Sequence, residues 1–96
     1  MTVYAIVQLR IHDQAPFERY VAGFMPVLRQ YGGRLVATDG GPEVIEGEWA
    51  GDRVVVLGFD DRDAFTTWFN SPEYQEIVTD RRAAAETTML LVQGVD

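Results

Sequence analysis

The hydrophobic periodicity of this 96-residue chain changes repeatedly along its length, and these changes constrain the fold more than any other feature. Apolar residues with a period near two indicate β-strands, whereas apolar residues that recur every three or four positions indicate amphipathic α-helices. We expect strands at 3–11, 34–49, 53–59 and 88–93, and helices whose apolar stripes run over 17–31, 64–69 and 74–85. This order predicts a single ferredoxin-like α+β domain over residues 1–96, with a βαββαβ plan and a four-stranded antiparallel sheet.

Polar residues and glycines mark the expected helix ends. An Asp or Ser before a helical stripe can accept hydrogen bonds from the free backbone N–H groups of the first turn. The expected N-caps are Asp13, Asp60 or Asp61, and Ser71. A proline follows Ser71 and suits the first helical position. Gly32-Gly33 is expected to end the first helix, with one of the two glycines in the left-handed conformation.

The second strand is the least regular of the four. Residues 34–38 have an extended pattern, the run Asp39-Gly40-Gly41-Pro42 interrupts it, and residues 43–49 resume it. We interpret this stretch as one long strand with a bulge or turn in the middle, or as two short strands. A hairpin turn at Gly51-Asp52 is expected to lead into the third strand.

Several strands are apolar on both faces. Residues 54–57 and 89–92 are continuous apolar runs, and Tyr4 and Ile6 place apolar surface opposite Ala5. A sheet with helices on one face and water on the other should instead alternate apolar and polar residues. We therefore expect a second copy of the chain to cover the other face, giving a homodimer through the sheet faces. The alternative is a monomer in which such runs reflect β-propensity alone.

Composition excludes several classes of function. Fifteen acidic and eight basic residues give a net charge of −7, so nucleic acids and anionic membranes are poor partners. The chain has no Cys and a single His, which leaves no usual zinc ligand set and no helical haem ligand. We therefore expect no metal and no cofactor. No apolar run approaches ~18 residues and the N-terminus lacks a signal-peptide pattern, so a cytoplasmic location is the default expectation.

Residues along the whole chain resemble those of a known family. They are Tyr4, Tyr20, Pro26, the runs Tyr31-Gly32-Gly33-Arg34 and Glu46-Gly47-Glu48-Trp49, Arg53, Phe59, and the run Trp68-Phe69-Asn70-Ser71-Pro72-Glu73-Tyr74-Gln75. With them the chain resembles the bacterial family known as domain of unknown function 1330, within the dimeric α+β barrel superfamily. The resemblance implies this fold and a dimer with facing sheets. It implies no reaction, because the superfamily includes cofactor-free monooxygenases, lactone isomerases, haem enzymes and non-catalytic stress proteins.

The few titratable groups near the expected core are candidates for acid–base chemistry. His12 beside Asp13 can act as a general base near neutral pH, or simply be an exposed corner residue. Glu46 and Glu48 are expected on one strand face near an apolar wall, where the pKa of one carboxyl would rise. Arg34 can pair with one of them or bind an anionic substrate. The alternative for these three is a structural ion-pair network.

Aromatic residues are expected to form a layer between the helices and the sheet. A pocket for a flat apolar ligand can open in this layer, although plain core packing would use the same residues. A buried phenol needs a hydrogen-bond partner, which makes Tyr20 and Tyr74 the most informative members. The expected ligand-binding residues are Arg34, Trp68, Tyr74 and Phe24, and the expected catalytic residues are His12, Glu46 and Tyr20.

Three functional hypotheses follow. The first is a cofactor-independent enzyme that acts on a small hydrophobic or aromatic metabolite in the pocket under the first helix. The second is a non-catalytic dimeric module that binds a small ligand or serves in stress responses. The third is a structural dimer whose aromatic layer is fully packed and has no cavity.

Overall fold

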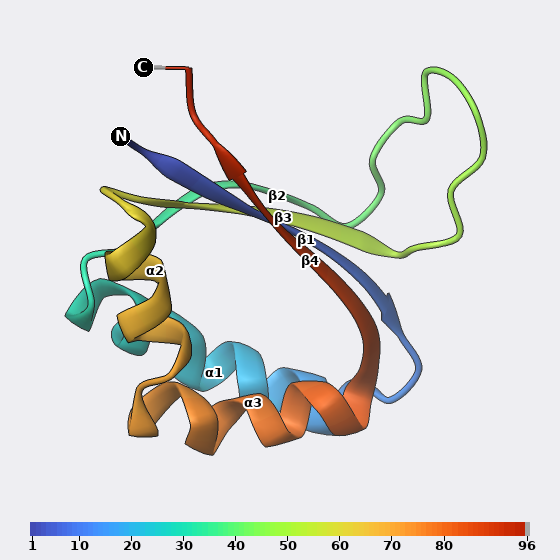
Figure 1. The fold of residues 1–96 in the computed structure, drawn as a ribbon. Helices are drawn as coiled ribbons and strands as arrows, with labels where there is room; N and C mark the ends of the chain where they lie inside the picture. Colours follow the sequence, from blue (N-terminus) through green and yellow to red (C-terminus); the bar gives the residue numbers. More distant parts are fainter. Residues whose placement is uncertain (96) are drawn as a thin grey trace.

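The computed structural model describes residues 1–95, in which four antiparallel strands form one sheet and three helices cover one of its faces (Figure 1). The elements are β1 (Val3–Ile11), α1 (Gln14–Gln30), β2 (Arg34–Asp39), β3 (Arg53–Phe59), α2 (Arg62–Phe69), α3 (Pro72–Ala84) and β4 (Ala85–Gln93). The strand order is β2-β3-β1-β4. The expected ferredoxin-like fold is therefore confirmed.

The helix ends follow the expected capping chemistry in two of three cases. The Ser71 side chain accepts a hydrogen bond from the Tyr74 backbone N–H at 3.1 Å, and Asp61 accepts from the Ala64 N–H at 2.8 Å. Asp13 occupies the N-cap of α1 as expected, but its side chain makes no capping hydrogen bond, so only the hydrogen-bond part of this prediction is wrong. Instead the backbone N–H of Asp13 donates to the Ala84 carbonyl at 3.2 Å, which ties the start of α1 to the end of α3.

The end of α1 and the start of β4 refine the sequence-based boundaries. Gly32 has φ +76°, so it is the left-handed residue expected after the helix. Ala85 was expected in the last helix, yet it begins β4 and pairs with Ile11 of β1. The sheet therefore takes three residues that precede the predicted strand start at 88, because cross-strand pairing with β1 outweighs local helical periodicity.

Residues 43–49 do not form a strand, which is the main correction to the predicted fold. After β2 ends, the Asp39 side chain accepts a hydrogen bond from the Gly41 N–H at 2.9 Å and turns the backbone away from the sheet. The chain then forms a long loop over residues 40–52 that extends beyond the sheet (Figure 1). Asp52 brings it back, because its N–H donates to the Leu9 carbonyl and its carboxylate accepts from the Ile11 N–H, both at 2.7 Å.

The sheet has an inner face toward the helices and an outer face away from them. The inner face is buried, and fully buried residues such as Leu57 and Phe59 of β3 lie there with alternate residues of β1. The outer face is also largely apolar but partly exposed, with Val36 at 52%, Leu90 at 51% and Val92 at 42% relative exposure. The expectation that the strands are apolar on both faces is confirmed.

Candidate functional site

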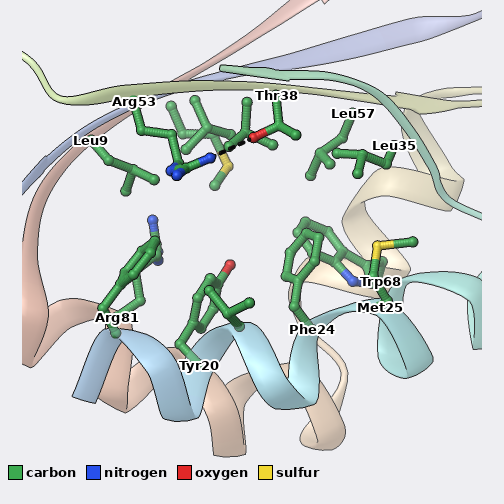
Figure 2. A pocket seen from close by; sticks show the side chains of 15 residues that line it. Leu9, Tyr20, Phe24, Met25, Leu35, Thr38, Arg53, Leu57, Trp68 and Arg81 are labelled. Atoms are coloured by element: carbon green, nitrogen blue, oxygen red, sulfur yellow. Dashed lines mark hydrogen bonds between the residues drawn. The ribbon is translucent and has the colours of Figure 1, made fainter. Parts of the chain in front are cut away.

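A cavity of about 270 Å³ lies between α1 and the inner face of the sheet (Figure 2). Its roof is formed by inward-facing residues of β1 and β3, among them Val7, Leu9, Val55 and Leu57. Its lower wall is formed by the helices, which contribute aromatic side chains (Figure 2). The aromatic layer is therefore not fully packed, which contradicts the hypothesis of a structural dimer without a cavity.

A β-bulge in β2 shapes one side of the cavity. The register with β3 shifts between Leu35 and Ala37, which adds one residue to β2. Because of this extra residue, Leu35 and Thr38 both face the cavity although they are three positions apart. A hydroxyl group thus enters an otherwise apolar wall.

The aromatic layer is partly core and partly cavity wall. Tyr20, Phe24 and Trp68 line the cavity, whereas Tyr74 lies behind them with no exposed surface. The Phe24 and Trp68 rings meet edge to face with centroids 6.1 Å apart, and the Trp68 and Tyr74 centroids are 4.1 Å apart. These contacts hold the cavity-facing rings in fixed orientations, which suits recognition of a flat ligand.

Tyr20 and Tyr74 share one hydrogen bond, which leaves one of the two hydroxyl protons free for another acceptor. Their oxygens are 2.9 Å apart in a buried hydrogen bond between α1 and α3. Burial raises the pKa of the Tyr20 phenol far above its ordinary range, and the neighbouring Tyr74 adds to this effect. Burial also raises the pKa of Tyr74. Tyr20 therefore stays protonated at neutral pH, where it can donate a hydrogen bond to a ligand oxygen but cannot act as a phenolate base.

Two arginines enter the same cavity from opposite sides. Arg53, the first residue of β3, lies under the sheet and donates from Nη1 to the Thr38 hydroxyl at 3.1 Å (Figure 2). Arg81 of α3 is only 5% exposed, and its guanidinium carbon lies 5.9 Å from the centre of the Tyr20 ring. The two guanidinium groups face each other across the cavity (Figure 2). They make the site electropositive in a protein whose net charge is −7.

The sequence-based search for site residues missed both arginines, although a signal for each was present. Arg53 has the same parity as the buried Leu57 and Phe59 of its strand, so period-two alternation places it on the inner face. Arg81 follows Tyr74 and Val78 by seven and three positions, so it belongs to the buried stripe of α3. In both cases, a charged residue at the spacing of a buried apolar stripe indicated a buried charge.

Other residues expected at the site lie elsewhere. Glu46 and Glu48 are exposed in the 40–52 loop, so the expectation that they face an apolar wall is wrong. Arg34 is exposed at the end of the sheet and forms an ion pair with Asp60 at 2.9 Å, so the expected pairing with these glutamates is wrong as well. His12 is exposed at the corner between β1 and α1. None of the four lines the cavity.

The described residues contain neither a metal-binding cluster nor a helix able to cross a membrane. Within residues 1–95, no group of three or more His, Cys, Asp or Glu side chains is placed to hold a metal ion. Over the same residues, every helix is too short or too polar to cross a membrane.

The family match decides the classification of this chain. The model of the family described as "Domain of unknown function (DUF1330)" matches residues 2–95. The chain belongs to this family. The resemblance seen in the sequence is thus confirmed over nearly the full length of the chain. No curated protein matches the chain.

Solved structures similar to this DUF1330 protein share its fold at low sequence identity. A protein of unknown function from Rhodopseudomonas palustris has a TM-score of 0.86 and 18% identity, over 99% of this chain and 83% of that one. SnoaB, a cofactor-independent oxygenase from Streptomyces nogalater, has a TM-score of 0.69 and 20% identity, over 99% and 94% of the two chains. A dimeric ferredoxin-like protein of unknown function from Thermobifida fusca has a TM-score of 0.66 and 14% identity, over 98% and 92%.

Proposed function

We propose that this protein is a homodimer that binds a small aromatic or apolar molecule in the cavity between α1 and the sheet, and that it acts on this molecule without a cofactor. The cavity itself is the observation that carries the proposal. An apolar cavity of about 150 Å³ is large enough to bind benzene. A volume of about 270 Å³ therefore suits a compound of one or two rings.

The cavity offers hydrogen-bond donors but no strong base. Tyr20 contributes a protonated phenol, and Phe24 and Trp68 contribute aromatic surfaces. In residues 1–95, no imidazole or carboxylate lines the cavity. As catalytic groups, His12 and Glu46 stay predictions, and each would have to act from outside the cavity of its own protomer. The fold is shared with SnoaB, a cofactor-independent oxygenase, which supports the enzymatic form of the proposal by analogy alone.

The lack of a base in the cavity wall favours a second candidate, a module that binds its ligand without changing it. The two candidates differ in the fate of the bound compound. An enzyme would convert it in air without added metal or cofactor, whereas a binding module would release it unchanged. Mass spectrometry of the compound after incubation with the protein distinguishes these outcomes.

The homodimer part of the proposal rests on the outer face of the sheet. Its exposed apolar side chains include Val36, Leu90 and Val92, and the similar proteins include one described as dimeric. Light scattering at micromolar concentration should give twice the 10.8 kDa mass of one chain. Val56→Asp on the outer face should give a monomer, whereas Val95→Asp, at a fully exposed position, should not. A monomeric wild-type protein would contradict this part.

Ligand binding is tested with naphthalene-2-carboxylate and its neutral isostere naphthalene-2-carboxamide. We expect calorimetry to detect binding of at least one of them to the wild-type protein. Val55→Phe should abolish it, because the added ring occupies the cavity from the inner face of β3. Val95→Phe makes the same change where no cavity exists and should leave binding unchanged. If neither compound binds, or if Val55→Phe binds as well as wild type, the cavity is not the ligand site.

A further inference from the structure

Four buried side-chain polar atoms have no hydrogen-bond partner within residues 1–95, and all four residues line one of two adjoining cavities. The atoms are Nε of Arg53, Nε1 of Trp68, Nε of Arg81 and Oγ1 of Thr87. The second cavity, of about 250 Å³, shares Arg81 and Met89 with the first. Since buried polar groups are normally paired, their concentration at one place indicates a function there.

We propose that the cavity binds an aromatic or apolar carboxylate, with the carboxylate group held between Arg53 and Arg81. This inference rests on the proposed function and specifies the class of its ligand. Three of the four unpartnered groups are N–H donors with no capacity to accept. A ligand that satisfies them must supply acceptor oxygens, and an anionic group also neutralises the two cations.

The strand register and α3 together bring three of these groups to the place where the two cavities adjoin. Leu9 of β1 pairs with Arg53 of β3 on one side and with Thr87 of β4 on the other. Paired residues of neighbouring strands point to the same face, and strands lie about 4.8 Å apart. Arg53 and Thr87 therefore flank Leu9 on the inner face. Arg81 approaches the same end from α3, and its guanidinium group points into the cavity (Figure 2).

The cation of Arg81 is buried without an anionic partner. The ion pairs within residues 1–95 are Arg19 with Asp80 and Arg34 with Asp60. The Tyr20 ring offers Arg81 a cation–π contact, which compensates only part of the lost hydration. An arginine cannot become neutral by losing its proton in the way that a buried lysine can. A bound anion would supply the missing compensation.

The protein itself does not provide that anion. The chain has fifteen acidic residues, yet none within residues 1–95 lines either cavity. The opposite end of the main cavity is closed by Trp68 and Phe24, with aromatic faces and one free indole N–H. The site is thus divided into an electropositive end for a carboxylate and an aromatic end for the body of the ligand.

The experiment compares naphthalene-2-carboxylate with naphthalene-2-carboxamide, which has the same shape without the charge. We expect calorimetry to show that the wild-type protein binds the carboxylate about tenfold or more tightly. Arg81→Met and Arg53→Met should each remove most of this preference, because methionine keeps the length and apolar volume but not the charge. Arg29→Met, which changes an exposed arginine of α1, is the matched control and should keep the preference.

The possible results separate this inference from the proposed function. If both compounds bind equally to the wild-type protein, the cavity is a ligand site but the carboxylate assignment is wrong. If neither binds, both are wrong. If the preference persists in Arg81→Met and Arg53→Met, the anion is held elsewhere and the inference is overturned. Should Arg81→Met fail to fold, Arg81→Lys replaces it, and we expect a weakened preference because lysine keeps the charge without the planar donor pair.

Discussion

Replacing Arg81 by methionine should make the ligand-free protein more stable. Arg81 is only 5% exposed, and it carries a charge that no carboxylate within residues 1–95 neutralises. Exchanging a buried ion pair or triad for apolar residues of similar volume is often neutral or stabilises by about 1–4 kcal/mol, and removing a single unpaired buried charge should act in the same direction. The lost cation–π contact with Tyr20 opposes this gain by about 0.5–2 kcal/mol.

From the middle of the two ranges, the net expectation is a gain of about 1 kcal/mol in the free energy of unfolding. In a domain of this length each kcal/mol raises Tm by about 4–8 °C. Differential scanning calorimetry of the ligand-free protein at one fixed protein concentration measures this shift, because Tm of a dimer depends on concentration. Arg29→Met should change the free energy of unfolding by no more than about 0.5 kcal/mol.

Ligand should remove most of this stability difference. A carboxylate at about one hundred times its wild-type Kd stabilises the wild-type protein by about 2.7 kcal/mol, whereas a variant that binds it about tenfold more weakly gains about 1.4 kcal/mol. If Arg81→Met instead lowers Tm of the ligand-free protein by several degrees while Arg29→Met does not, then the Arg81 charge is already compensated. The reasoning that assigns it to a ligand would then be refuted.

Three further predictions concern the framework of the site. Tyr20→Phe should lower the free energy of unfolding, measured by urea denaturation, by about 1–3 kcal/mol because it leaves the buried Tyr74 hydroxyl unpaired. In the double variant with Tyr74→Phe, the loss should be smaller than the sum of the two single losses. Additive losses would contradict the hydrogen bond. The Tyr31 hydroxyl donates a hydrogen bond to Glu73 at 2.8 Å and lowers the pKa of the Glu73 carboxyl. The contact therefore stabilises the fold when the pH is above the pKa that this carboxyl has in the unfolded chain. Its contribution is lost as the pH falls through the lower pKa of the folded protein. Thermal scans should therefore show that the Tm difference between wild type and Tyr31→Phe, present at pH 7, disappears in acid; a constant difference would contradict the link. Gly33→Ala should lower the free energy of unfolding by about 1–3 kcal/mol because a Cβ there would overlap Leu28 and Phe59. An unchanged denaturation midpoint would contradict this prediction and show that the neighbouring side chains move to make room for the Cβ.

Much of the fold could be predicted because its signals are local. The bounds of β1 and β3 agree with the expected 3–11 and 53–59, since alternation of apolar residues reports directly on strand geometry. Ser71 and Asp61 could be identified as caps because capping chemistry acts within one helical turn. The error at 43–49 has the opposite origin. An extended, alternating pattern there has no neighbouring strand to pair with, because the chain leaves the sheet after Asp39.

Within the site, the aromatic residues were predicted and the charged ones were missed. Tyr20, Phe24 and Trp68 belong to apolar stripes, so their place between helix and sheet follows from periodicity. Glu46 and Arg34 were expected near them because a strand was expected at 43–49. Arg53 and Arg81 have the parity and spacing of buried residues, but their charge suggests the surface when each is considered alone.

Local patterns in the sequence account for the order of strands and helices, the two apolar faces of the sheet and the membership of the aromatic layer. These properties depend on residues a few positions apart and on their periods. The cavity between α1 and the sheet, with Arg53 and Arg81 facing each other in it, arises only when the elements pack together. The two arginines lie 28 positions apart on a strand and a helix, so their proximity depends on the register of β3 with β1 and on the packing of α3. Those are properties of the packed chain, which no local pattern contains.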